Sequence, residues 1–165
     1  MSGFTYAEVG ATRGGELPDG YAHLRYRLPV GTGVMATAAE ALLTWRLHRS
    51  AGVRITASAP RAAEGVRVTS VLGIGPLGLR APCEVVWSVE SEHEAGFGYG
   101  TLAGHPESGE ESFVVERLGD EVWFTVTAFS RPAVWYTRAA GPVVGWFQHA
   151  YARRLGTTLR RLCAR

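Results

Sequence analysis

Apolar and polar residues alternate over residues 21–28, and this pattern predicts a strand. A repeat of two with one apolar face is typical of a strand buried on one side. The apolar face consists of Ala22, Leu24, Tyr26 and Leu28. The preceding residues are rich in glycine and turn signals, so they predict an irregular N-terminal arm over residues 1–20.

The repeat becomes helical after this strand. Thr37 and Glu40 have the spacing of a capping box, in which each side chain bonds the backbone amide of the other residue. Apolar positions then recur every three or four residues, and Gly52 predicts the end of the helix. The polar side of this helix is expected to consist of Thr37, Glu40, Thr44 and His48.

Six further apolar segments, separated by glycine, proline or acidic turn residues, predict six strands. They cover residues 53–58, 66–72, 83–90, 96–103, 112–117 and 121–129. Short strands without intervening helices are typical of an antiparallel meander.

The last third of the chain has helical spacing again. Ser130 as a cap and Pro132 in the first turn predict a helix start, and Gly141-Pro142 interrupts the helix. From residue 142 to residue 163 the apolar side chains recur every three or four positions, so a helix of roughly 33 Å is expected.

The whole chain, residues 1–165, is therefore expected to form one α+β domain in the order strand, helix, six strands, helix. One long amphipathic helix covers only one face of a seven-stranded antiparallel sheet. A curved sheet around such a helix is a helix-grip-like arrangement, in which the space between sheet and helix is often a cavity.

Composition limits the class of protein and its partners. Of the 165 residues, 46% are hydrophobic, which suffices for a core, and a net charge of only +2 argues against a nucleic-acid partner. No apolar run approaches the roughly 18 residues of a membrane span, so no stable membrane insertion is expected. Cys83 and Cys163 lie outside any C-x-x-C pair, so we expect buried thiols, a cytoplasmic location, no metal and no cofactor. Nothing in the sequence indicates the oligomeric state.

Residues 73–78 match the nucleotide-binding pattern G-x-G-x-x-G letter for letter. That mechanism requires a helix directly after the loop, whose N-terminus binds the phosphates. Pro76 lies within the motif and another strand is expected to follow, so the motif predicts an interstrand loop.

Three glycines leave one face of the fourth of these six strands bare. Gly96, Gly98 and Gly100 share a face because alternate strand residues point the same way. A bare face indicates that something approaches the backbone closely. We expect either the C-terminal helix or, in a groove, a flat or elongated ligand.

The densest polar cluster is Gly104-His105-Pro106-Glu107-Ser108-Gly109-Glu110-Glu111. A histidine beside carboxylates suits general acid–base chemistry, so His105, Glu107 and Glu110 are candidate catalytic residues. The same residues equally suit the polar rim of a ligand pocket, or a solvated hairpin loop whose acids pair with Arg131. One histidine among glutamates is a weak signature for a metal site.

Several motifs together resemble a known family. They are Tyr6-x-x-Val9-Gly10-x-Thr12-Arg13, Leu17-Pro18-x-Gly20-Tyr21, the run from Gly98 to Glu111, Ser130-Arg131-Pro132 and Gly141-Pro142. Over nearly its whole length the chain resembles an uncharacterised family, the domain of unknown function numbered nineteen-ninety. The resemblance gives no indication of an activity or of a cofactor. The element order is similar, in architecture alone, to START-like lipid-transfer and pollen-allergen-type proteins.

We therefore expect a protein that holds a small hydrophobic or amphipathic molecule between the sheet and the C-terminal helix. The residues expected to bind it are Tyr99, Thr101, His105, Glu107, Glu110, Arg131, Trp87 and Trp123. A less favoured alternative is an enzyme on the same scaffold, with His105 and a nearby glutamate as acid and base. A further alternative is an interaction module whose arginine-rich C-terminal helix faces a protein or an anionic membrane.

Overall fold

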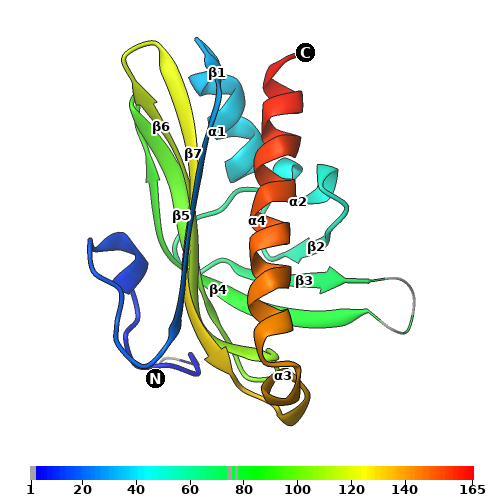
Figure 1. Cartoon of the computed structure of the whole chain (residues 1–165). Helices are drawn as coiled ribbons and strands as arrows, with labels where there is room; N and C mark the ends of the chain where they lie inside the picture. Colours follow the sequence, from blue (N-terminus) through cyan, green and yellow to red (C-terminus); the bar gives the residue numbers. More distant parts are fainter. Residues whose placement is uncertain (1–2, 74–75, 77) are drawn as a thin grey trace.

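The structure is a computed structural model, and it describes residues 3–73, 76 and 78–165. Seven strands form one antiparallel sheet in the order β1-β7-β6-β5-β4-β3-β2 (Figure 1). The strands are β1 (Ala22–Thr32), β2 (Arg54–Ala57), β3 (Arg67–Leu72), β4 (Leu79–Glu90), β5 (Glu94–Thr101), β6 (Glu107–Leu118) and β7 (Glu121–Pro132). The helices are the 3₁₀ turn η1 (Ala11–Arg13), α1 (Met35–Leu43), α2 (Arg46–Ser50), α3 (Trp135–Ala140) and α4 (Pro142–Cys163). The predicted seven-stranded sheet with a long C-terminal helix is confirmed.

The sheet has one face toward the helices and one toward the N-terminal arm (Figure 1). Helices α1, α2 and α4 lie on the first, which we call the helix face. Residues 3–20 lie on the other, which we call the arm face, and Phe4 forms a bridge to Leu102 just beyond β5. Alternate side chains of a central strand therefore meet either the helices or the arm.

The C-terminal half of α4 packs tightly on the helix face. Leu155 and Leu159 are fully buried in one core with Phe124 of β7. Gly156 lets Leu28 of β1 approach so closely that a Cβ there would lie 2.5 Å from Leu28 Cδ2. Each large side chain buried in this core stabilises the fold by about 1.5–3 kcal/mol. This half of the sheet–helix interface is filled by side chains.

The predicted capping box at Thr37 is wrong. Helix α1 begins at Met35, and its N-cap residue, Val34, makes no side-chain hydrogen bond. Glu40 instead pairs with the Arg61 guanidinium, at 2.8 Å, on the surface. Glu40 thus pairs with Arg61, which is distant in sequence, and not with the local residue Thr37.

The single helix predicted to run to Gly52 is broken at Trp45, whose φ of 65° is left-handed. The Trp45 indole donates a hydrogen bond to the carbonyl oxygen of Ala59 at 3.1 Å. After this break, His48, expected on the polar side, is fully buried against the Phe113 ring. Burial lowers the pKa of His48 to about 4, so its imidazole is neutral near neutral pH.

The polar cluster that was expected in a loop lies in a strand. β6 begins at Glu107 rather than at residue 112, and it pairs with β7 throughout. β7 likewise continues to Pro132, so Ser130 and Pro132 end a strand rather than start a helix. Proline is tolerated at a strand end, where its missing N–H donor interrupts little of the ladder.

Two other sequence expectations concern segments outside this core. The motif at residues 73–78 includes Ile74, Gly75 and Leu77, which lie outside the described residues, and strand β4 follows it from Leu79. Within the described ranges, no helix is both long and apolar enough to cross a membrane.

Candidate functional site

Two adjacent glutamates of β6 point to opposite faces of the sheet. Alternation along the strand places Glu110 on the arm face and Glu111 on the helix face. Their hydrogen bonds agree, because Glu110 bonds the arm whereas Glu111 bonds Tyr99 of the helix-face core. The two faces therefore present two separate candidate sites.

Glu110 is enclosed by hydrogen-bond donors of the arm. Its Oε2 accepts from the Tyr6 hydroxyl at 2.5 Å and from the Gly10 amide at 2.7 Å. Its Oε1 accepts from the Thr12 amide at 3.0 Å and from the Thr12 hydroxyl. We call these four residues the arm latch. Because its carboxylate oxygens are engaged and the residue is only 2% exposed, Glu110 anchors the arm and is not free to act on a ligand.

The bare face of β5 receives two aromatic side chains on the arm face. A Cβ on Gly100 would lie 2.7 Å from Cε1 of Tyr6, and a Cβ on Gly98 would lie 2.7 Å from Cε2 of Trp87. The Trp87 indole also donates to the Thr12 hydroxyl at 3.0 Å. Both expectations for this face, the C-terminal helix and a ligand, are therefore wrong, since Tyr6 and Trp87 occupy it.

Glu111 has sparse hydrogen bonding on the helix face. Among the described residues its donor is the Tyr99 hydroxyl, at a long 3.4 Å. Burial raises the pKa of Glu111 to about 7, because the ionised form loses hydration that one long hydrogen bond replaces poorly. Burial, and then the nearby Glu111 charge, raise the pKa of Tyr151 on α4. We call Glu111, Tyr99 and Tyr151 the inner polar group.

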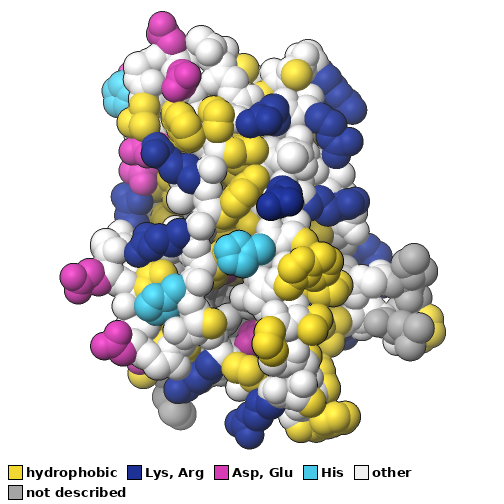
Figure 2. All heavy atoms as spheres, in the orientation of Figure 1, with side chains coloured by type: hydrophobic (Ala, Val, Ile, Leu, Met, Phe, Trp, Pro, Cys, Tyr) yellow, Lys and Arg dark blue, Asp and Glu magenta, His cyan; other side chains and the backbone are white. Residues whose placement is uncertain are grey.

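Small side chains surround the inner polar group on the sheet. Ala128 lies directly opposite Glu111 in the β6–β7 register. Other small residues buried on the same face are Ser70, Ala81 and Cys83. Glu111 keeps part of its surface accessible although it faces the interior. Figure 2 shows a recess between the lower part of the sheet and α4.

The residues expected to bind a ligand do not converge. Tyr99 belongs to the inner polar group, whereas Trp87 and Glu110 lie on the arm face. Trp123 also lies on the arm face, with the Arg27 guanidinium carbon 4.5 Å from its ring centre. Thr101 helps to attach the arm, because its hydroxyl oxygen lies 2.5 Å from that of Thr5.

Three of the expected residues lie at the end of the sheet where β6 begins and β7 ends: His105, Glu107 and Arg131. The Glu107 amide donates to His105 Nδ1 at 2.9 Å, and burial lowers the pKa of His105 to about 4. This bond runs to the backbone of Glu107 and not to a carboxylate, so it does not build the expected acid–base pair. Glu107 has a buried Oε1 without a partner among the described atoms, and burial raises its pKa. Arg131 stacks on the Tyr21 ring at 4.8 Å.

His105 and Arg131 share a surface hollow of about 580 Å³. It lies between the arm, the turn from β5 to β6, and the segment that leads into α3. Its lining residues are Thr5, Gly104, His105, Ser108, Arg131, Pro132, Ala133, Val134 and Arg138. Arginines and hydroxyls give this hollow a basic, polar character.

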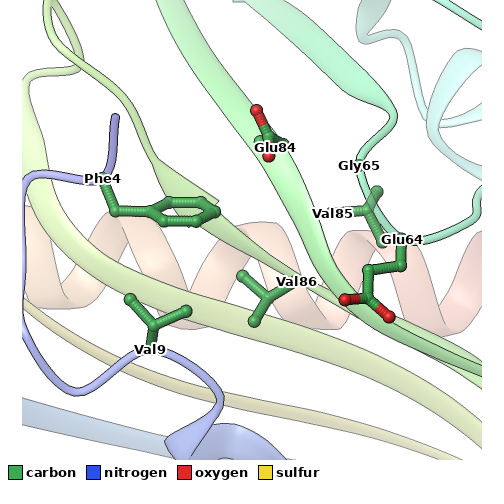
Figure 3. A pocket seen from close by; sticks show the side chains of 7 residues that line it. All are labelled: Phe4, Val9, Glu64, Gly65, Glu84, Val85 and Val86. Carbon is green, nitrogen blue, oxygen red and sulfur yellow. The ribbon is translucent and has the colours of Figure 1, made fainter. Parts of the chain in front are cut away.

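A second hollow, of about 540 Å³, lies on the arm face beside β4 (Figure 3). Phe4 and Val9 of the arm and Val86 of β4 form its apolar side, with Glu64 and Glu84 at the rim. Glu84 already pairs with Arg67 at 3.2 Å. Neither of these two hollows lies between the sheet and α4.

The arginines of the C-terminal helix serve partly within the fold. Arg154 donates to the carbonyl oxygen of Ala51 at 2.5 Å, and Arg160 donates to that of Pro29 at 2.8 Å. Both side chains thereby tie the end of α4 to neighbouring elements.

Sequence reasoning missed Glu111 and Tyr151 as site residues. Glu111 alternates with Phe113 and Val115, so it interrupts an apolar strand face. That interruption was a usable signal, but it depended on extending the strand back to residue 111. Tyr151 lies on the apolar stripe of α4 and carries no local signal that separates it from core residues.

The fold resembles solved structures that share little sequence with the chain. A hypothetical protein from Helicobacter pylori superposes with a TM-score of 0.67 at 12% identity, covering 98% of this chain and 96% of that one. Truncated norcoclaurine synthase from Thalictrum flavum gives 0.61 at 10% identity, covering 86% and 92%. The fold is therefore of the Bet v 1-like, helix-grip class.

The family is shown by sequence. The model of the family described as Domain of unknown function (DUF1990) matches residues 5–158. A UPF0548 protein of Deinococcus radiodurans is 36% identical over 170 residues, which cover 95% of this chain and 86% of that protein. This chain belongs to the DUF1990 family, as its motifs predicted.

The motifs that carry this resemblance meet in space. Tyr6, Gly10 and Thr12 come from the first motif, and Glu110 comes from the glycine–histidine run. Together they form the arm latch. Four of the residues that carry the resemblance therefore hold the arm against the sheet.

Proposed function

We propose that this protein binds a small hydrophobic or amphipathic molecule between the helix face and the N-terminal half of α4. The polar end of the ligand would lie at Glu111. The observation that carries the proposal is the position of this carboxyl group on a mostly apolar interior face, with one long hydrogen bond and accessible surface. Apolar pockets use a few such polar groups to orient a ligand.

The inner polar group suits a ligand with one hydroxyl, carboxyl or amine. A carboxyl group with a pKa of about 7 both donates and accepts hydrogen bonds near neutral pH. The Tyr151 hydroxyl adds a further donor, and the Tyr99 hydroxyl oxygen a further acceptor. Ala81 and Ala128, small residues on the same face that keep a little accessible surface, would contact the apolar part of the ligand. The Bet v 1-like class, in which hydrophobic ligands are common, supports the same reading.

Mass spectrometry tests the proposal directly. Protein purified without organic solvent is expected to show an added mass under native conditions that disappears on denaturation. A displacement assay with the apolar dye anilinonaphthalene sulfonate would then rank long-chain acids, alcohols and amines. A clean native mass, together with no displaceable dye, would contradict ligand binding.

Two variants locate the site. Ala128→Leu places a larger side chain opposite Glu111, and Glu111→Gln removes the ionisable group. Each is expected to weaken displacement of the dye by the best ligand by about tenfold or more. Matched controls are Ala150→Leu on the exposed side of α4 and Glu116→Gln on the surface, which should leave binding unchanged. Equal binding by all four variants would place the ligand elsewhere.

Glu111 also supports a second candidate function, general acid–base catalysis on a bound ligand. A carboxyl group with a pKa near the working pH transfers protons efficiently in both directions. This candidate replaces the expected His105 pair. It requires that the co-purified molecule change chemically on incubation with the wild-type protein and remain unchanged with Glu111→Gln.

A further inference from the structure

One end of the molecule exposes a group of large apolar side chains. Trp135 is 78% exposed and Trp146 is 68% exposed. The complete set, which we call the aromatic patch, is Trp135, Tyr136, Val143, Trp146 and Phe147. These residues belong to α3 and to the first turns of α4, and Figure 2 shows apolar side chains gathered at that end. Exposed apolar patches of this kind mark interaction sites.

The charge of this part of the chain has one sign. Residues 122–165 contain no aspartate or glutamate, and their arginines are Arg131, Arg138, Arg153, Arg154, Arg160, Arg161 and Arg165. Two of them line the hollow that adjoins α3. Of two acids near that hollow, Glu8 accepts a hydrogen bond from the Tyr21 hydroxyl and Glu107 is buried. The aromatic patch is therefore bordered by basic groups.

We propose that the aromatic patch docks the protein peripherally on an anionic lipid bilayer. Tryptophan and tyrosine prefer the membrane–water interface, because their rings are apolar and their N–H and O–H groups bond water and headgroups. Arg131 and Arg138 would meet acidic headgroups, to which basic groups beside a membrane are attracted. Amphipathic helices lie flat at such an interface, and the exposed apolar residues here are carried by α3 and the first turns of α4. This docking goes beyond the proposed ligand binding and does not depend on it.

The alternative occupant, a second copy of the chain, fits the charges poorly. A symmetric dimer would bury the same patch of both partners, so it would bring two sets of bordering arginines to one interface. Like charges across an interface oppose association. A bilayer surface of opposite charge matches both the aromatic residues and the arginines.

Vesicle co-sedimentation tests the docking. The full chain is expected to bind vesicles of phosphatidylcholine mixed with phosphatidylserine, and to bind vesicles of phosphatidylcholine alone much more weakly. Trp135→Ala combined with Trp146→Ala should lower the partition coefficient by about tenfold or more. The matched control combines Val9→Ala with Leu118→Ala, two exposed apolar residues outside the patch, and should bind like the wild type.

A second pair of variants separates charge from apolar contact. Arg131→Gln with Arg138→Gln should remove most of the preference for phosphatidylserine, whereas Arg80→Gln with Arg165→Gln should keep it. Tryptophan emission should shift to shorter wavelength on vesicles in the wild type and not in the tryptophan variant. Three results would overturn the proposal: no binding to either vesicle, equal loss in the control variants, or a solution dimer that the tryptophan variant converts to monomer.

Discussion

Glu110 and Glu111 are neighbours in sequence, but they occupy opposite environments. Glu110 lies under the arm and accepts hydrogen bonds from the Tyr6 hydroxyl, the Thr12 hydroxyl and two backbone amides. Glu111 lies under α4 with one long bond from Tyr99. The arm face satisfies its buried acid completely, and the helix face does not.

Hydrogen bonding, and not residue type, distinguishes the two acids. A buried carboxylate that accepts hydrogen bonds from all its neighbours is costly to remove, because its donors are then left without an acceptor. A buried carboxylate with few donors lowers the stability of the fold, so its presence is not explained by stability. The arm face therefore holds the arm to the sheet, and the helix face carries the ligand site that we propose. Substitutions on either face test one side of this contrast.

The largest effect is expected from Glu110→Ala. The substitution leaves the Tyr6 hydroxyl, the Thr12 hydroxyl and two amides without their acceptor in a buried seam, so the free energy of unfolding should fall by about 3–5 kcal/mol. Urea denaturation measures the loss, and proteolysis in residues 3–20 should become faster. If Glu111→Ala cost more than Glu110→Ala, the assignment of the two faces would be reversed.

Gly100→Ala tests the arm face from the other side of the seam. The new Cβ would lie 2.7 Å from Cε1 of Tyr6, so the ring must move and strain its bond to Glu110. Overpacking of this kind costs about 1–3 kcal/mol of unfolding free energy. Thermal unfolding provides the measurement.

The control for that substitution is Gly15→Ala in the same arm, because a Cβ there would meet nothing within 4 Å. It should change the unfolding temperature little. A comparable loss in both variants would mean that the arm tolerates no alanine for reasons unrelated to Tyr6.

The order of elements was predictable because it depends on local patterns. Alternation and helical spacing located every strand and both ends of α4 without knowledge of any partner. Glu107 and Glu110 were assigned to a loop, because no residue near them in sequence indicates that either would be buried in a strand. The donors that make burial of Glu110 possible, Tyr6 and Thr12, lie about 100 residues away in the chain. His48 was misplaced for a similar reason, because the break at Trp45 depends on a bond to distant Ala59.

Glu111→Gln is expected to stabilise the protein, in contrast to substitutions at Glu110. The pKa of Glu111 is raised from 4.5 to about 7 in the folded state. The wild type therefore loses stability as the pH rises from about 4.5 to about 7, and glutamine removes this loss. The gain should be about 1–2 kcal/mol at pH 8, because part of the group is solvated, and should vanish near pH 4.

The comparison must be made as a difference between variant and wild type at each pH. His48 and His105, whose pKa values are lowered to about 4, act in the opposite direction and destabilise the fold as the pH falls below about 6.5. They contribute equally to both proteins, so they cancel in the difference. A gain that stays constant between pH 4 and pH 8 would show that the pKa of Glu111 does not differ between the folded and unfolded states.

The smallest change in the free energy of unfolding is expected from Tyr99→Phe. It is to be compared with the change caused by Tyr6→Phe. Tyr6 donates to Glu110 at 2.5 Å, in the range of a strong charge-assisted bond, whereas Tyr99 donates to Glu111 at 3.4 Å, near the limit for a hydrogen bond. Loss of the hydroxyl should therefore cost about 1.5 kcal/mol or more of unfolding free energy at Tyr6 and about 0.5 kcal/mol or less at Tyr99. Urea denaturation of both variants under the same conditions checks the ratio. Equal losses would mean that Glu111 is held as firmly as Glu110, and the helix face would then have no polar group to spare for a ligand.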